Sequence, residues 1–421
     1  MNASLVETTA RSHTSQESPV AIVGLGYVGL PTALALTEAG SPVIGIDSSP
    51  QRLLAIEDQR VDLLPDDHAR LAAALAAGAD SLRLTLDATA LAEADTVLVC
   101  VPTPVDDDAR PDLTALRAAC ATVVEHARPG QRLILTSTSY VGTTQELLVE
   151  PLTVRGLHAG RDLHVAFAPE RIDPGSVAHA QQHVPRVVGG ATPGCTEAAA
   201  AVLERTAGAI HRVSSLETAE LSKLYENTFR AVNIALANEL SDLARDLGVD
   251  ALEVTDAAAT KPYGYMPFFP SAGVGGHCIP CDPHYLLHSL PQGAAQAPLV
   301  GQAMLSIAAR PTQVAARALE RLAEDGIDPS RARIAIVGAA YKPGVADVRE
   351  SPALDLAAVL REAGATVTLH DPLVAEYAAV PDPAAHDLAL MVTVHPGQDL
   401  GWLDGVERLL DATYRTRGEV V

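Results

Sequence analysis

The feature that most constrains the fold is a strand–turn–helix–strand pattern between residues 20 and 47. A short apolar run, Val20–Val23, stops at the sequence G-L-G-Y-V-G, which occupies residues 24–29. A segment rich in Ala and Leu follows to Gly40, and a second apolar run ends at Asp47. The first glycine of such a motif makes the turn, the second admits a pyrophosphate, and the third lets helix and strand pack. The pattern therefore predicts a dinucleotide-binding domain, and the acid at Asp47 favours NAD over NADP.

Further apolar runs predict neighbouring strands of the same sheet. Residues 96–101 and 132–136 form two such runs, and the polar loops after them contain Thr103 and Thr138. Ligands of parallel sheets bind beyond the carboxyl ends of the strands, so we expect both threonines to touch the cofactor. Ordinary loop polarity is the alternative interpretation. A later strand ends at Glu170, whose carboxylate is placed to face the same site.

A long helix is predicted from about residue 215 to 247, where apolar side chains recur until Gly248. Lys223 and Asn227 are four residues apart and therefore share one face of this helix. An isolated lysine is usually a solvated surface charge, but this one stands among apolar neighbours and beside an amide. The pair is therefore a candidate for function. A helix of this length often bridges domains and forms a dimer interface.

The C-terminal third contains a second αβ unit. Apolar runs at 333–338 and 367–372 flank a helix that begins at Ser351 and Pro352. The intervening turn lacks a complete glycine fingerprint, so we do not expect a second dinucleotide there. Two cations of this unit, Lys342 and Arg349, are candidates for binding phosphate. A cleft between the two αβ units is the default place for a ligand.

A glycine-rich loop at 273–283 carries a thiol, Cys278, and a carboxylate four residues later, Asp282. A thiol, a nearby carboxylate and a permissive backbone are what covalent carbonyl chemistry needs. The alternative is a turn with two buried, inert cysteines. The neighbouring histidines and cysteines suggest zinc, but the two residues between Cys281 and His284 are too few for a tetrahedral site. We therefore expect no metal, although a redox pair remains an alternative.

The composition limits the possible partners. The chain has 421 residues, which predicts two or three domains. Its formal net charge of −22 argues against nucleic acid or an anionic membrane surface as the main partner. Five cysteines, an odd number, do not make a disulfide framework and favour a cytoplasmic setting. No apolar run is long enough to cross a membrane, and the polar first 19 residues are expected to be a disordered tail.

With these pieces in order, the chain resembles the UDP-glucose/GDP-mannose dehydrogenase family, the nucleotide-sugar 6-dehydrogenases. Several independent motifs carry the resemblance in the family's order. They are Gly24–Pro31, Cys100–Pro104, Ser137–Thr138 with Gly142–Thr144, Pro169–Arg171, Leu221–Thr228, Gly275–Cys278, and Lys342–Pro343 with Arg349–Pro352.

The resemblance implies an α/β fold. It has two Rossmann-like doubly wound domains joined by a long central helix and a small all-α middle domain, usually dimeric through that helix. We expect a tail at 1–19, an NAD-binding domain at 20–205, a central domain with the cysteine loop at 206–325, and a nucleotide-sugar-binding domain at 326–421.

The resemblance also implies two successive NAD-dependent oxidations at sugar C6, from alcohol through aldehyde to acid. By this resemblance Cys278 is the nucleophile that forms a thiohemiacetal and then a thioester. Lys223 is similar to the cation that stabilises oxyanions, and Asp282 to the base that handles protons and water. Three further residues match positions that hold the hydrolytic water or the sugar: Glu170, Thr138 and Asn227.

Binding positions follow from the same resemblance. The cofactor would be held by Gly24, Gly26, Tyr27, Val28, Gly29, Asp47, Arg52, Pro102, Thr103, Thr138 and Arg349. A nucleoside-diphosphate hexose would be held by Glu170, Arg171, Lys223, Asn227, Phe269, Gly275 and Lys342.

Departures from the family pattern leave the identity of the sugar undecided. His277 before the cysteine is similar to the UDP-N-acetylhexosamine branch, whereas Ser271–Ala272 and Phe269 differ from that branch. An NDP-glucose substrate therefore stays an alternative. A two-electron NAD-dependent hydroxyacid or polyol dehydrogenase is the rival enzyme, and it would not need Cys278. A structural or NAD-sensing Rossmann protein is the non-enzymatic rival.

Overall fold

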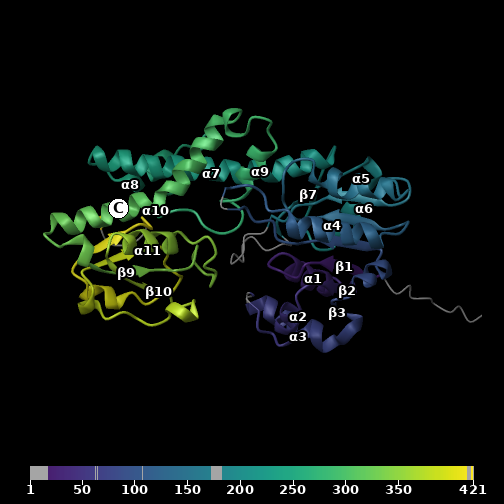
Figure 1. Cartoon of the computed structure of the whole chain (residues 1–421), viewed down its shortest axis with the longest axis horizontal. Coiled ribbons are helices and arrows are strands. Elements are labelled where there is room, and N and C mark those ends of the chain that lie inside the picture. Colours follow the sequence, from purple (N-terminus) through teal and green to yellow (C-terminus); the bar gives the residue numbers. More distant parts are fainter. Residues whose placement is uncertain are drawn as a thin grey trace, which may run out of the picture.

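The computed structural model describes residues 18–61, 63, 65–106, 108–171, 183–414 and 419–420. Figure 1 shows two α/β lobes that are linked along one side by long helices. Residues 1–17, most of the predicted N-terminal tail, lie outside the described part. Among the described helices, none combines the length and the apolar character that crossing a membrane requires.

The first lobe is built on an eight-stranded sheet with the order β3-β2-β1-β4-β5-β6-β7-β8. The order of its first six strands is that of a dinucleotide-binding fold. All neighbouring pairs are parallel except β6 and β7. The strands are β1 Val20–Val23, β2 Val43–Ile46, β3 Leu82–Thr85, β4 Thr96–Val99, β5 Arg132–Leu135, β6 His164–Phe167, β7 Arg186–Gly190 and β8 Ile210–Val213.

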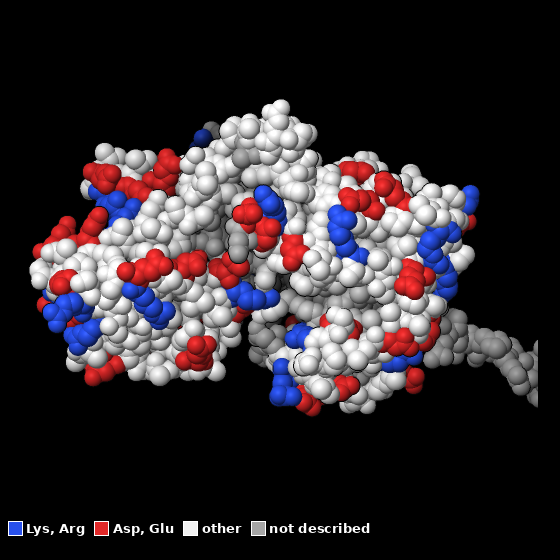
Figure 2. All heavy atoms as spheres, in the orientation of Figure 1, with Lys and Arg blue, Asp and Glu red and all other residues white. Residues whose placement is uncertain are grey.

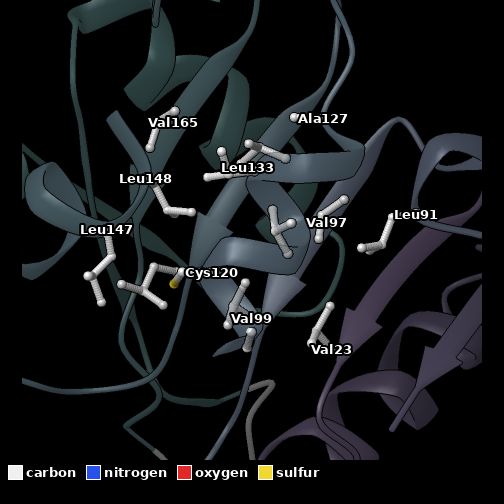
Figure 3. Close-up of a cluster of buried hydrophobic side chains, with 14 of the residues drawn as sticks. Val23, Leu91, Val97, Val99, Cys120, Ala127, Leu133, Leu147, Leu148 and Val165 are labelled. Carbon is white, nitrogen blue, oxygen red and sulfur yellow. The ribbon is translucent and has the colours of Figure 1, made fainter. Parts of the chain in front are cut away.

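Helices cover both faces of this sheet because the strand side chains alternate between two cores. Ala21 and Val23 belong to a core shared with α4, α5 and the start of α7, part of which Figure 3 shows. Val20 and Ile22 belong to the opposite core, shared with α1, α3 and α6. The helices are α1 Gly29–Glu38, α2 Pro50–Glu57, α3 Pro65–Ala77, α4 Thr114–His126, a π-helical turn Gln145–Val149, α5 Glu150–Val154 and α6 Pro193–Leu203.

The long helix α7 spans Leu216–Asp246 and agrees with the prediction over 215–247. The Ser215 hydroxyl caps its first turn, and Gly248 follows its end with a φ of +69°, a conformation that favours glycine. Figure 1 shows α7 running from the first lobe towards the second. The other helices of this central part are α8 Ala251–Ala259, α9 Asp282–His288 and α10 Pro298–Glu324.

The second lobe holds a parallel sheet with the order β10-β9-β11-β12-β13. One of its faces packs against α10 and α11. Its elements are β9 Arg333–Val337, α11 Pro352–Glu362, β10 Thr366–His370, β11 Leu388–Met391, β12 Leu409–Asp411 and β13 Glu419–Val420. Short 3-10 turns complete the described structure at Gly78–Asp80, Ala88–Glu93, Gly293–Ala295, Pro329–Arg331, Ala375–Tyr377, Pro383–Ala385 and Gly401–Gly405.

The architecture agrees with the predicted fold class: two Rossmann-like units joined by a long helix and a small helical middle part. The four domain boundaries stay predictions. The structure bears on one of them, the predicted end of the first domain at residue 205: strand β8 lies beyond this residue and pairs with β7 in the first sheet. The first structural unit therefore continues past that boundary.

A buried arginine fastens α7 to the second lobe. Arg310 of α10 is 1% exposed and donates to Asp242 on α7 at 2.8 Å, to the Ser271 carbonyl at 3.1 Å and to the Tyr414 hydroxyl at 2.9 Å. Charge-assisted bonds of this kind are among the strong ones in proteins. The far end of α7 and the loop before the cysteine are thus held at one point.

Candidate active site

The glycine loop after β1 leaves room for a ligand at one position and excludes side chains at the others. Gly24 has a φ of +88°, and a Cβ on Gly29 would collide with the Gly24 carbonyl. A Cβ on Gly26 would meet nothing within 4 Å, so the backbone there is open. Val28 caps α1 without a side-chain bond. Open backbone at a helix N-terminus fits a pyrophosphate.

Asp47 follows β2 and accepts hydrogen bonds from Leu25 N at 2.8 Å and Ser49 N at 2.9 Å. It is half-buried, so part of the carboxylate stays accessible to a ribose. Arg52 donates from Nε to the Leu25 carbonyl at 2.8 Å and thereby supports the loop. These residues fit NAD as predicted.

The second lobe repeats this arrangement in a closed form. Asp371 follows β10 and accepts hydrogen bonds from the amides of Ala339 and Ala340, both at 2.9 Å. It is fully buried and also pairs with His395 at 2.9 Å. Its carboxylate is therefore not available to a ribose, which agrees with the expectation that this unit holds no second dinucleotide.

The two threonine loops of the first lobe contact each other. Thr103, which follows Pro102, donates from its hydroxyl to the Thr138 carbonyl at 2.7 Å. The buried Tyr285 of α9 donates to the Thr103 carbonyl. The Thr103 hydroxyl thus donates its hydrogen bond to another loop of the protein. A direct contact of Pro102, Thr103 or Thr138 with the cofactor stays a prediction.

Helices α7 and α9 bring the predicted catalytic residues together. Lys223 and Asn227 are buried on α7, and Asn227 donates from Nδ2 to Asp282 Oδ2 at 2.5 Å. Asp282 begins α9, and its amide donates to the Cys278 carbonyl at 2.9 Å. Cys278 is exposed, whereas the other four cysteines of the chain are buried. One thiol is therefore accessible beside a buried amide, cation and carboxylate.

The electrostatics of this group suit proton transfer. Burial raises the pKa of Asp282 to about 6, although Lys223 and Asn227 act in the opposite direction. The surrounding protein likewise raises the pKa of the Cys278 thiol, and Lys223 opposes that shift. At neutral pH Asp282 is mostly an available base, and Cys278 is a thiol that needs one.

The cysteine loop is pressed against the second lobe. A Cβ on Gly275 would collide with the Glu350 carbonyl, and one on Gly276 would meet the Tyr341 ring. Arg349 of the same segment lies 4.4 Å from the centre of the Tyr27 ring in the NAD loop, a cation–π contact. The cofactor loop, the cysteine loop and the second lobe therefore meet. Figure 2 shows this face of the molecule hollowed between the lobes.

Charged side chains surround Cys278, and two other predicted site residues, Glu170 and Arg171, form ion pairs within the protein. The Cys278 thiol is influenced by Lys223, Asp282, Arg230 and Lys342. Glu170 instead pairs with Arg186 at 3.4 Å, and Arg171 forms a bidentate pair with Glu226 of α7. Phe269 is half-buried in the segment before the cysteine loop. The functional contacts of Glu170, Arg171 and Phe269 stay predictions.

Sequence reasoning missed a carboxylate that orders one loop of the site. Glu220 is 1% exposed and accepts from Gly142 N at 2.6 Å and Thr144 N at 2.9 Å. It thereby fixes the loop that follows Thr138. Its position three residues before Lys223, on the same helix face, is the signal that would have found it. Arg230, seven residues after Lys223, could have been found in the same way, because it too lies on the helix face of Lys223.

No set of three or more His, Cys, Asp and Glu side chains in the described part of the chain could hold a metal ion. Cys281 is buried, and burial raises the pKa of its thiol to about 12, so it is a poor nucleophile and metal ligand.

Comparison with known proteins identifies the family. Residues 18–207 match the NAD binding domain of the UDP-glucose/GDP-mannose dehydrogenase family, residues 217–306 its central domain, and residues 335–394 its UDP binding domain. The chain belongs to the UDP-glucose/GDP-mannose dehydrogenase family. This confirms the resemblance inferred from the motifs.

Individual relatives are similar over most of their length. UDP-N-acetyl-D-mannosamine dehydrogenase of Pyrococcus horikoshii is 36% identical over 363 residues, 84% of each chain. UDP-N-acetyl-D-glucosamine 6-dehydrogenase of Pseudomonas aeruginosa is 32% identical over 389 residues, 89% of this chain and 90% of the relative. The solved structure of the Pyrococcus horikoshii enzyme superposes with a TM-score of 0.87 and 32% identity, covering 96% of this chain and 97% of that one.

Membership of the UDP-glucose/GDP-mannose dehydrogenase family settles the reaction class predicted from the sequence. The protein is an NAD-dependent nucleotide-sugar dehydrogenase that oxidises a sugar alcohol to the uronic acid, a four-electron reaction. A two-electron hydroxyacid or polyol dehydrogenase and a non-enzymatic Rossmann protein are thereby set aside.

Proposed function

We propose that the enzyme oxidises C6 of a UDP-N-acetylhexosamine to the uronate through a covalent Cys278 intermediate. The observation that carries this proposal is the meeting of an exposed thiol with the buried Lys223, Asn227 and Asp282. The names of the relatives, which are N-acetylmannosamine and N-acetylglucosamine enzymes, support an N-acetylated sugar. His277 before the cysteine supports the same substrate class.

In the first oxidation Asp282 would take the proton of the C6 hydroxyl. Its pKa of about 6 makes it a base at neutral pH that can still release the proton afterwards,. The Lys223 ammonium would stabilise the negative charge that develops on the C6 oxygen. When bound, NAD accepts the hydride from C6 in each of the two oxidations. The product of this step is the aldehyde.

In the second half the Cys278 sulfur would bond to the aldehyde carbon, and its thiol proton would pass through Asp282 to the aldehyde oxygen, which becomes the hydroxyl group of a thiohemiacetal. Loss of hydride and of the hydroxyl proton from this thiohemiacetal gives a thioester. Water then attacks the thioester carbon, the C–S bond breaks, and the sulfur leaves as thiolate while the carboxylate forms. Asn227, which donates to Asp282, would keep that base oriented. Glu170 and Thr138 would hold the attacking water.

We assign the remaining binding roles to residues around the place where the cofactor loop, the cysteine loop and the second lobe meet. Lys342 and Arg171 would contact the sugar nucleotide, and Arg349, beside Tyr27, would contact phosphate. Gly275 and Phe269 would border the sugar. The five free cysteines support a reducing compartment such as the cytoplasm,.

We further propose that the enzyme is a homodimer through α7. Large apolar side chains on this helix are exposed, which is typical of protein interfaces. They are Leu221 (45%), Tyr225 (65%), Phe229 (40%), Leu236 (61%) and Leu243 (52%). A surface hollow of about 430 Å³ lies beside Leu221 and Tyr225 and is bordered by Val141. A second copy of α7 would cover this face.

The dimer can be tested with Leu236→Glu. A charge in a buried apolar interface is unfavourable, so the variant is expected to sediment as a monomer where the native chain sediments as a dimer. Leu54→Glu on α2, an exposed leucine of the first lobe (56%), is the control and should leave the mass unchanged. A dimeric Leu236→Glu protein would show that α7 is not the interface.

Counting NADH per sugar nucleotide tests the reaction and the substrate together. The enzyme would be supplied with excess NAD and limiting UDP-N-acetylmannosamine, UDP-N-acetylglucosamine, UDP-glucose or TDP-glucose. Two NADH per sugar with an N-acetylated substrate, and a product with the mass of the uronate, are expected. One NADH per sugar would contradict the thioester route. Two NADH with glucose alone would contradict the proposed sugar.

A further inference from the structure

Arg186 is a buried charged side chain at the first position of β7, and the proposed reaction assigns no role to it. It is 1% exposed and donates from Nη2 to the Ala168 carbonyl at 3.2 Å. Its Nε and Nη1 atoms have no hydrogen-bond acceptor among the described residues. Buried polar groups are normally hydrogen-bonded, so two buried guanidinium nitrogens without acceptors are costly.

The direction of β7 explains why this arginine lies near the site. The site is at the carboxyl edge of the parallel strands, and an antiparallel strand presents its first residues at that edge. In the printed register Ala166 pairs with Gly190 and Phe167 with Gly189. Continuing this register places Arg186 opposite Glu170. A parallel β7 would have carried Arg186 to the other end of the sheet.

The Glu170 carboxylate is held on both of its oxygens. Oε1 accepts from Arg171 N at 2.8 Å, and Oε2 lies 3.4 Å from Arg186 Nη1. The second distance is longer than a direct charge-assisted hydrogen bond, which is about 2.7–2.9 Å. A separation of 3.4 Å is too short for a water to lie between these two atoms, but a water beside the pair can accept from the guanidinium and donate to the carboxylate, and would thereby give the unpaired Arg186 donors an acceptor,.

We propose that Arg186 is a positioning residue that orients Glu170 and, with it, binds the water used to hydrolyse the Cys278 thioester. The inference rests on the proposed function, because it needs the thioester and the role of Glu170 in water attack. The water oxygen forms the new bond to the acyl carbon, the C–S bond breaks, and the sulfur leaves as thiolate. One proton of the water passes to Asp282, and the acid product releases the other.

The test uses Arg186→Gln and Arg186→Lys in the full-length enzyme, mixed rapidly with NAD and UDP-N-acetylmannosamine or UDP-N-acetylglucosamine, whichever the enzyme turns over. A misplaced catalytic group can cost about 10²-fold in rate. For Arg186→Gln we expect a rapid formation of NADH followed by a steady rate ~10²-fold below native, with KM for the sugar nucleotide little changed. Intact-protein mass spectrometry should find the acyl adduct on Cys278 accumulating. Arg186→Lys, which keeps the charge, should restore part of the rate.

Two comparisons make the result specific. Arg212→Gln on the neighbouring strand β8 removes an exposed arginine that pairs with Glu197 and Glu204, and it should behave as native. Glu170→Gln should accumulate the same adduct, and adding Arg186→Gln to it should change little further.

The outcomes distinguish a failure of the role proposed for Arg186 from a failure of the thioester route. Native rate and no adduct in Arg186→Gln, while Glu170→Gln accumulates the adduct, would overturn the role of Arg186 and leave the proposed function standing. No adduct in any variant, Glu170→Gln included, would overturn the proposed thioester route instead. If Arg186→Gln does not fold, Arg186→Lys decides: a folded lysine variant with native rate and no adduct overturns the proposal, and one with slow turnover and adduct supports it.

Discussion

Cys278→Ala is expected to stop uronate formation, with a loss of at least ~10³-fold in the rate of the complete reaction. The reason is that the second hydride must leave a tetrahedral carbon that carries a hydrogen and a hydroxyl group, and the thiol creates this carbon by adding to the aldehyde as a thiohemiacetal. The first oxidation needs Asp282 and Lys223, which remain. The measurement is NADH per sugar nucleotide together with the mass of the product. At most one NADH per sugar should be found.

Two further variants sharpen this result. Cys278→Ser replaces the thiol with a poorer nucleophile, so it should stall during or after oxidation of the aldehyde. Cys281→Ala is the matched control, since this cysteine is three residues away but buried. It should keep two NADH per sugar. If Cys278→Ala also gave two NADH and uronate, the covalent route would have to be abandoned.

Asp282→Asn is expected to slow both oxidations by ~10²–10⁴-fold, the usual contribution of a positioned base. Asparagine keeps the shape and can still accept from Asn227, but it takes up no proton. In the native enzyme kcat/KM should rise as the pH increases through about 6, where Asp282 loses its proton. The variant should lack this rise. An unchanged pH profile would remove Asp282 from the role of base.

The same substitution is expected to stabilise the fold above pH 6. Burial raises the pKa of Asp282 from 3.8 to about 6, so between these values the folded chain binds more protons than the unfolded chain. Stability then falls as the pH rises through this range, by about 3 kcal/mol in total. Asp282→Asn avoids this cost, and its Tm should exceed the native value at pH 8, with the difference shrinking towards pH 4. A lower Tm at pH 8 would contradict the assignment.

The sequence predicted correctly those features that depend on interactions between residues near one another in the chain. The glycine loop and Asp47 predicted β1, α1 and β2, because the turn, the pyrophosphate approach and the close packing each need their own residue. The apolar repeat and Gly248 predicted α7. Lys223 and Asn227 could be paired in advance because helix geometry places residues four apart on one face.

Other features depended on contacts that local sequence does not encode. The antiparallel direction of β7 is set by which neighbour it pairs with, so the position of Arg186 opposite Glu170 was not predictable. The hydrogen bond from the Thr103 hydroxyl to the Thr138 carbonyl joins two loops that are 35 residues apart, so it was not foreseen, and the contact of Thr103 with the cofactor stays a prediction. Glu220 was missed because a carboxylate on an amphipathic helix looks solvated until the loop it holds is known.

The two lobes show one fold put to separate uses. The acid after the second strand stays accessible in one lobe, as Asp47, and is sealed by its own loop in the other, as Asp371. An open acid in one unit and a sealed acid in the other divide two kinds of recognition between two sheets. Evolution or protein engineering can then retune cofactor choice in the first copy, for instance by replacing Asp47, without rebuilding the surface that reads the sugar nucleotide.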